Sequence, residues 1–454
     1  MENEGSGAAN AEASVTPIAP EASPKSSVFK NALNKLGSSS SSKKEKSSNI
    51  LQSATTGFFG RKKASSNPPM FPGSVKQASF CGAQLPPVWA APPPVVKNLN
   101  PNDTNHTSST SLNDTTTVPG SRNAAGNLRS EQFAALLKSD KDSVDLERLR
   151  ELSWGGVPVE FRPLVWKLLL SYVPAHNDRR DAMLTRKRSE YRNLLNQYYY
   201  IPDTDRGVKE QETLHQILID IPRTNPDVPL FQNPVIQKCM ERALYIWAIR
   251  HPASGYVQGI NDLLTPFVTV FLSSFSEDPE RCDMTQISDD IVQEIEADSY
   301  WCLTKLLDDI QDHYTFSQPG LQRMVQRMED LVRRCDADLH GHIVETEQVQ
   351  FVQFAFRWMN CLLMRECPLN AIIRLWDTYL CEDNGFESFH VYVCAAILMT
   401  FGDALKDMPF QDLVLFLQKL PTNEWGEHDI EPLLSRAYIL QTYFADAPNH
   451  IPHK

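Results

Sequence analysis

The amino-acid sequence predicts an all-α fold, with one large helical domain that forms a single body or two lobes. Apolar residues recur at helical spacing from about Ser130 onward, and the helical segments are joined by short polar or Pro-containing connectors. Strand-like alternation is almost absent, and no repeat of fixed period indicates a solenoid. We therefore predict a disordered Ser/Pro/Asn-rich region at 1–127, the helical domain at 128–446 and a short C-terminal tail at 447–454.

The N-terminal region is predicted to be disordered because its aliphatic residues are scattered without period among Ser, Pro, Asn, Thr and Ala. Such a segment cannot bury enough apolar surface to offset its ordering entropy. It carries 12 Lys+Arg and 7 Asp+Glu, which gives a net charge of +5. Because the whole chain has a net charge of −12, the rest of the chain carries −17. An acidic folded part argues against a nucleic-acid partner, because proteins that bind nucleic acids usually present a basic face.

One motif in this region involves Ser66. The basic cluster at residues 61–63 precedes it and Pro68 follows it, which resembles a phosphorylation-dependent docking site for 14-3-3 proteins. The alternative is a solubilising tract without a specific partner.

The sequence predicts a soluble cytoplasmic protein that associates with membranes peripherally at most. The acidic start is followed by no apolar core, so no signal peptide is expected, and no apolar stretch is long enough to span a bilayer. The nine cysteines lie singly, which suits reduced thiols.

The helical domain can be divided into segments by its apolar periodicity. Leu146, Leu149 and Leu152 form one stripe that ends at Gly155-Gly156, and Pro158 is predicted to open the next helix. Further helices are predicted near 181–198, 208–219, 234–250, 259–275, 288–313, 320–335, 345–366, 368–380, 388–405, 410–419 and 428–444.

Arg223 is the first candidate functional residue. Pro222 is expected to end the preceding helix near Asp220, so that Arg223 projects from a stiff loop. Asp220 could accept a hydrogen bond from the guanidinium and fix its direction. An arginine presents a permanent cation with a planar set of donors that suits a transferring phosphoryl group. The alternative is an ordinary exposed arginine in a surface ion pair.

Gln258 is the second candidate. It lies between Gly255 and Gly259, after a helix that ends at His251-Pro252, and the glycines let the backbone approach a partner closely. Tyr256 can anchor this loop through its ring and its hydroxyl group. A glutamine amide donates and accepts, so it can orient an attacking water. The alternative is a capping or buried amide.

Two further clusters are predicted to be structural. Arg162 and Trp166 lie four residues apart on one helix face, and the segment Arg374–Asp377 combines a buried aromatic residue with charges that could join two helices. Cys335, His340 and His342 lack the second half of a zinc site, so no metal is expected. Without a Gly-Lys dipeptide there is no phosphate-binding Walker loop.

The ordered combination of these motifs resembles the TBC-domain Rab GTPase-activating proteins. The pattern comprises Arg162-x-x-x-Trp166, Ile217-x-x-Asp220-x-x-Arg223 and Tyr256-x-Gln258. More closely, residues 219–225, 251–262 and 347–358 resemble the member-22 subfamily and the related fungal Gyp class.

The resemblance implies that Arg223 and Gln258 act in trans on a GTP-bound Rab, supported by Asp220 and Tyr256, while Arg162 and Trp166 hold the fold. GTP and magnesium would belong to the partner, so the chain would need no cofactor and have no substrate site of its own. The family also points to Golgi membranes. The alternative is a Rab-binding scaffold with little catalytic activity.

Overall fold

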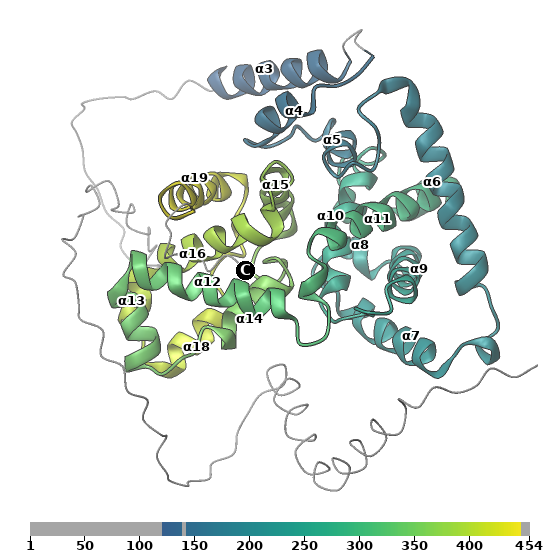
Figure 1. The fold of residues 1–454 in the computed structure, drawn as a ribbon. Helices are drawn as coiled ribbons and strands as arrows, with labels where there is room; N and C mark the ends of the chain where they lie inside the picture. Colours follow the sequence, from purple (N-terminus) through teal and green to yellow (C-terminus); the bar gives the residue numbers. More distant parts are fainter. Residues whose placement is uncertain (1–119, 139–141, 446–454) are drawn as a thin grey trace, which may run out of the picture. The chain divides into compact units, whose positions relative to one another are not determined.

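The computed structural model describes residues 120–138 and 142–445, which form a helical assembly (Figure 1). In this part of the chain the only extended pairing is an isolated bridge between Ser143 and His176. The α-helices are α3 (Gly120–Leu137), α4 (Leu146–Ser153), α5 (Arg162–Leu169), α6 (Arg180–Leu194), α7 (Val208–Asp220), α8 (Pro229–Gln232), α9 (Pro234–Arg250), α10 (Ile260–Leu272), α11 (Asp289–Asp309), α12 (Pro319–Cys335), α13 (Ala337–Gly341), α14 (Val352–Asn360), α15 (Leu369–Tyr379), α16 (His390–Thr400), α17 (Gly402–Lys406), α18 (Phe410–Gln418) and α19 (Glu427–Phe444).

Shorter helical turns connect several of these helices. The 3₁₀ turns are η2 (Asn177–Arg179), η4 (Asp203–Asp205), η5 (Ile221–Arg223), η6 (Pro279–Arg281), η7 (Met284–Gln286) and η8 (Gln311–His313), and the π-helical turns are η3 (Leu195–Tyr199), η9 (His342–Thr346) and η10 (Gly385–Phe389). The predicted all-α class is confirmed.

The first described helix, α3, starts at Gly120, before the predicted domain boundary at residue 128. Arg129 connects this helix to the end of α4 and the turn that follows it. Its guanidinium donates hydrogen bonds to the carbonyl oxygens of Leu152 and Gly156. Ser66 and the rest of the segment 1–119 lie outside the described residues.

The helices pack in two groups (Figure 1). In the first group, α11 contacts α6, α9 and α10, and α9 contacts α7. In the second group, α12 contacts α13, α14 and α16, and α19 contacts α15 and α16. Helix α10, which is buried along its whole length, contacts α9 and α11 in the first group and α15 in the second. Helix α10 therefore lies between the two groups of helices. Because buried apolar area is the main source of stability, we expect this helix to contribute strongly to the stability of the fold.

A buried carboxylate joins α5 to α15. Asp377 Oδ1 accepts hydrogen bonds from Trp166 Nε1 at 2.7 Å and from Arg162 Nε at 3.1 Å. Its other oxygen, Oδ2, forms a salt bridge with Arg162 Nη2 at 3.0 Å. Burial raises the pKa of Asp377, and the neighbouring Arg162 opposes that rise. Arg374 bonds Thr378 instead, so the cation that joins the two helices comes from α5.

Several helix predictions were wrong. Pro158 begins a turn, and helix α5 starts at Arg162 with Pro163 in its first turn, where the missing N–H is tolerated. The predicted helix 345–366 is interrupted by Gln348, with φ 56°, and ends at Asn360. The predicted helix 388–405 is divided between α16 and α17 at Phe401, whose φ and ψ of −99° and 7° are not helical.

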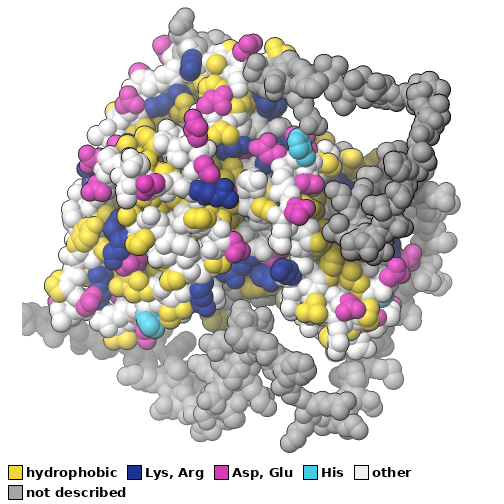
Figure 2. Space-filling view, turned by 180° about the vertical axis from the view of Figure 1, so that it is seen from behind, with side chains coloured by type: hydrophobic (Ala, Val, Ile, Leu, Met, Phe, Trp, Pro, Cys, Tyr) yellow, Lys and Arg dark blue, Asp and Glu magenta, His cyan; other side chains and the backbone are white. Residues whose placement is uncertain are grey.

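Among the described residues, none of the helices is both long enough and apolar enough to cross a membrane. On the face shown in Figure 2, basic and acidic side chains both lie among apolar ones.

Candidate functional site

Arg223 lies at the end of a 3₁₀ turn, η5, that continues directly from α7. Ile221 keeps α-helical φ and ψ of −55° and −51° although a proline follows it, so the helix tightens where the sequence predicted a stop and a loop. The Arg223 side chain is 59% exposed. Its Nη2 donates to Asp220 Oδ1 at 2.6 Å and its Nε donates to the Ile219 carbonyl at 3.0 Å. These bonds hold an exposed cation in one direction.

Asp220 connects this arginine to the loop that carries Gln258. Its side chain is 2% exposed, and while Oδ1 accepts from Arg223, Oδ2 accepts from the Tyr256 hydroxyl at 3.0 Å and from Gln216 Nε2 at 3.2 Å. Burial and the neighbouring Asp220 carboxylate raise the pKa of Tyr256, so its hydroxyl stays protonated and remains a donor. Arg223 and Tyr256 therefore share one carboxylate.

Gln258 lies on the segment 251–259 between α9 and α10, which we call the finger loop. Its side chain is exposed and makes no hydrogen bond to the described residues, whereas its backbone carbonyl accepts from Asn360 Nδ2 at 3.0 Å. The amide is thus available to a partner, and only the backbone at this position is fixed. The alternative of a buried amide does not fit this exposure.

The two glycines of the finger loop have different roles. Gly255, with φ 65°, faces open space, as expected for a backbone that a partner can approach. At Gly259, with φ 112°, a Cβ atom would collide with the amide nitrogen of Asn360. The close approach at Gly259 is therefore to another part of the same chain.

Sequence reasoning missed several residues that support the loop. Asn261 Oδ1 accepts from the Gly259 N–H at 2.9 Å and lies 3.2 Å from the Tyr256 hydroxyl oxygen, and its Nδ2 donates to Thr224 Oγ1 at 2.8 Å. Thr224 Oγ1 in turn donates to the Asp220 carbonyl at 3.0 Å. Asn261 lies two residues after Gly259, so a polar side chain at the start of an apolar helix was an available signal.

Comparison with known proteins assigns the chain to a family. The model of the Rab-GTPase-TBC domain matches residues 159–406, a segment that contains both the Arg223 turn and the finger loop. The chain belongs to the RabGAP-TBC family. Human TBC1 domain family member 22B is 55% identical over 324 residues, and the GTPase-activating protein gyp1 of Schizosaccharomyces pombe is 48% identical over 326 residues. Each match covers 71% of this chain but 63% of the relative, so the chain spans less than two thirds of the length of these relatives.

A solved structure supports the assignment. The crystal structure of the Ypt/Rab-GAP domain of Gyp1p superposes with a TM-score of 0.67 at 48% identity, covering 70% of this chain and 99% of that one. The resemblance to the member-22 subfamily and the fungal Gyp class is confirmed.

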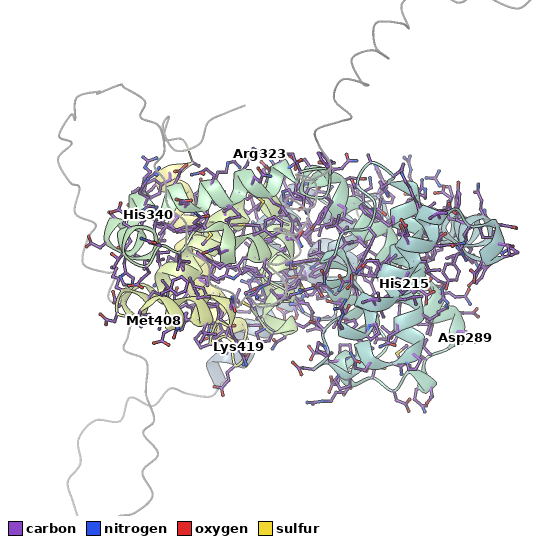
Figure 3. The ribbon with its side chains drawn as sticks, turned by 90° about the horizontal axis from the view of Figure 1, so that it is seen from below. His215, Asp289, Arg323, His340, Met408 and Lys419 are labelled. Carbon is purple, nitrogen blue, oxygen red and sulfur yellow. The ribbon has the colours of Figure 1, made fainter. Side chains whose placement is uncertain are left out.

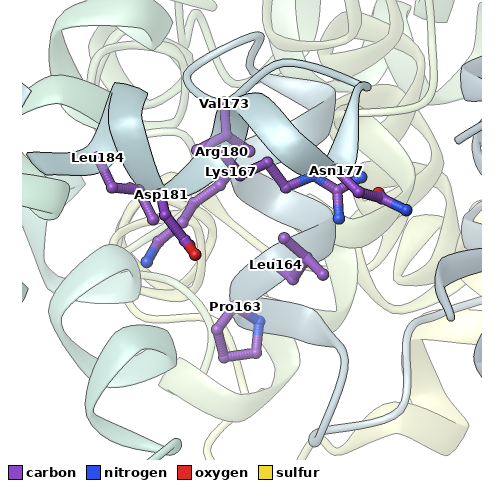
Figure 4. A pocket seen from close by; sticks show the side chains of 8 residues that line it. All are labelled: Pro163, Leu164, Lys167, Val173, Asn177, Arg180, Asp181 and Leu184. Atoms are coloured by element: carbon purple, nitrogen blue, oxygen red, sulfur yellow. The ribbon is translucent and has the colours of Figure 1, made fainter. Parts of the chain in front are cut away.

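The pocket in Figure 4 lies elsewhere in the RabGAP-TBC domain, on α5, α6 and the segment that joins them. Its volume is about 390 Å³, and its lining residues are Pro163, Leu164, Lys167, Val173, Asn177, Arg180, Asp181 and Leu184. Lys167 Nζ is paired with Asp298 at 2.6 Å, and Arg180 donates to the carbonyls of Pro174 and Ala175. Because both cations already have partners within the chain, we assign no function to this pocket.

The two histidines weighed as part of a metal cluster lie near other groups of the chain. His342 Nε2 lies 3.0 Å from the Met408 carbonyl, and His340 Nε2 lies 3.5 Å from a Glu329 carboxylate oxygen. Figure 3 shows His340 and Met408 at one end of the view and His215, on α7, in the other half. Within the described ranges, no group of three or more His, Cys, Asp or Glu side chains could hold a metal ion.

Proposed function

We propose that this protein accelerates GTP hydrolysis by a Rab-family small GTPase and that Arg223 and Gln258 supply the catalytic groups in trans. The observation that carries the proposal is the shared Asp220 carboxylate, which holds the Arg223 turn and the finger loop against each other while both functional side chains stay exposed. Relatives whose names describe GTPase-activating proteins support it.

The two side chains suit complementary tasks. The planar guanidinium of Arg223 would neutralise negative charge on the transferring γ-phosphoryl group, and the Gln258 amide would orient the attacking water. Asp220 and Tyr256 would keep both groups in place before the partner binds, which lowers the entropic cost of the reaction. GTP and Mg²⁺ would be bound by the GTPase, so this chain needs no cofactor of its own.

Single-turnover GTP hydrolysis across a panel of Rab proteins tests this function. With the best substrate we expect Arg223→Ala to lower the stimulated rate by about 10³-fold or more, because an arginine finger in trans typically contributes about 10³ to 10⁵. Arg148→Ala is the matched control, since Arg148 is similarly exposed, at 61%, and pairs with Glu151 on the same helix. Equal rates for wild type and Arg223→Ala on every Rab would refute the proposal.

A cellular test separates catalysis from a scaffold role. If hydrolysis is the function, Arg223→Ala/Gln258→Ala will bind the GTPase but fail to replace the wild-type protein in cells. Normal cellular function of this double variant would instead favour a Rab-binding scaffold.

We further propose that the protein acts in vesicle trafficking as a peripheral protein of Golgi membranes and that phosphorylated Ser66 binds 14-3-3 proteins. The family resemblance supports the location, and the basic cluster before Ser66 supports the docking site. Fluorescence microscopy with a Golgi marker tests the location. Loss of 14-3-3 capture in Ser66→Ala tests the docking site.

A further inference from the structure

The finger loop is held from the second group of helices at two points. Asn360, the last residue of α14, donates its Nδ2 to the Gln258 carbonyl at 3.0 Å. Arg365 donates its Nε to Asp262 Oδ2, in the first turn of α10, at 2.7 Å. These contacts lie on either side of the junction between the finger loop and α10. Residues about 100 positions later in the chain thus fix where that loop ends.

The backbone between these two residues is strained. Leu362 and Leu363 both have left-handed conformations, with φ of 47° and 62°, and both are fully buried. A non-glycine residue in this region is strained, because its Cβ atom lies too close to the following carbonyl oxygen. Strain of this kind persists only where the surrounding structure enforces it, and it concentrates at functional sites. Here it turns the chain immediately after Asn360 and brings Arg365 back to the same loop.

The stability of the fold alone does not explain why residue 360 is an asparagine. It is 8% exposed, and its Oδ1 is buried without a hydrogen-bond partner among the described residues. A buried polar atom without a partner destabilises the fold, and a leucine, which has no polar side-chain atom, would avoid this cost. The Tyr314 hydroxyl, which donates to the Asn360 carbonyl at 3.0 Å, holds the backbone in place whatever the side chain is. The side-chain amide donates to the Gln258 carbonyl and, at 3.7 Å, to Cys361 Sγ, and the first of these bonds is the one that reaches the finger loop.

We propose that Asn360 is a positioning residue for Gln258, an inference that rests on the proposed function. The Gln258 side chain has no hydrogen bond to the described residues, so its starting direction is set through its backbone. Because Asn360 fixes the Gln258 carbonyl, it restricts the direction of the Gln258 side-chain amide before the GTPase binds. Preorganisation of this kind raises the rate of the chemical step without strengthening binding.

The first test measures single-turnover GTP hydrolysis by the Rab that the protein activates best. The full chain is added at several concentrations. For Asn360→Leu and Asn360→Ala we expect the maximal rate to fall about 3- to 10-fold, the effect of one lost hydrogen bond. The half-saturating concentration should stay within about twofold, because the bond does not contact the partner. Gln326→Ala is the control, since Gln326 is exposed and bonds only Asp330 of its own helix.

Double variants show whether Asn360 acts through Gln258. Asn360→Leu should cause no further loss in the Gln258→Ala background and its full loss in the Arg223→Lys background. The same loss in both backgrounds would overturn the proposal. So would a fall in rate that only follows a fall in the melting temperature, because a positioning role lowers the activity beyond any loss of stability.

A measurement without any GTPase separates this proposal from the proposed function. Hydrogen exchange of the free chain reports on the Gly259 and Ile260 amides, which bond Asn261 Oδ1 and the Val257 carbonyl. Asn360→Leu should speed their exchange about threefold or more, and Gln326→Ala should not. Unchanged exchange would overturn the positioning role, whereas absence of Rab activation by the wild type would overturn only the proposed function.

Discussion

At the scale of single residues, the decisive feature of Arg223 is that it is both exposed and directed. Its Nη2 and Nε use two separate acceptors, Asp220 Oδ1 and the Ile219 carbonyl, which leaves Nη1 without a hydrogen bond in the described structure. An ordinary surface arginine contributes little from an ion pair. The buried Asp220 makes this one different, because a carboxylate that is 2% exposed holds a fixed position.

Arg223→Lys should therefore lose most of the GTPase-activating activity. An ammonium group is a single point of charge and cannot bond both acceptors while it also reaches a phosphoryl oxygen, so we expect a loss of about 10²-fold or more. Single-turnover hydrolysis measures the loss. Arg148→Lys provides the control, and near-wild-type rates for Arg223→Lys would contradict the proposed role.

The sequence was sufficient to predict Arg223, Gln258, Asp220 and Tyr256 as candidates, because each belongs to a short motif. It did not predict Asn360 or Arg365, whose partners lie about 100 residues earlier. No local spacing connects positions so far apart. Their roles follow only from the way the two groups of helices meet.

At the scale of elements, most helices could be predicted because apolar periodicity and prolines mark their limits. The segment 345–366 could not, since its breaks fall at Gln348, Leu362 and Leu363, none of which usually adopts a positive φ. Tertiary packing decides these conformations. Leu362 and Leu363 are fully buried, so the apolar area that they bury offsets the backbone strain.

The finger loop gives a prediction at this scale. Gly255→Ala adds only backbone strain, about 1–2 kcal/mol, because no atom of the described residues lies within 4 Å of the new methyl group. Gly259→Ala adds similar strain and also displaces the Asn360 amide from the Gln258 carbonyl. We expect Gly259→Ala to lose more activity than Gly255→Ala, and more than its own loss of stability explains. Thermal unfolding and single-turnover hydrolysis of both variants check this, and equal losses of activity would contradict it.

At the scale of the whole molecule, the site depends on contacts between the two groups of helices. Asp377 joins α15 to α5, and Asn360 and Arg365 join the second group to the finger loop. The candidate site is thus built from segments that lie far apart in the sequence. A family model that matches residues 159–406 covers all of these contacts.

The stability of this assembly should depend on His390, which is fully buried in the second group of helices. Its Nδ1 accepts from the Tyr379 hydroxyl at 2.7 Å and its Nε2 lies 3.1 Å from the Trp358 carbonyl, an arrangement that suits the neutral ring protonated on Nε2. Burial lowers the pKa of His390 from 6.5 to about 3. Between these values the unfolded chain binds a proton that the folded chain does not, so stability must fall as the pH falls.

We therefore expect the free energy of unfolding to contain a component that decreases by about 1.4 kcal/mol per pH unit between roughly pH 6 and pH 4. Buried carboxyl groups with raised pKa values, such as those of Asp262 and Asp377, act in the opposite direction, so the component must be isolated by comparison. Denaturant unfolding of wild type and His390→Gln at several pH values does this. The free energy of unfolding of His390→Gln should decrease less steeply than that of the wild type as the pH falls. The control His428→Gln, at an exposed position, should behave as the wild type. Parallel curves for wild type and His390→Gln would show that this ring does not control acid stability.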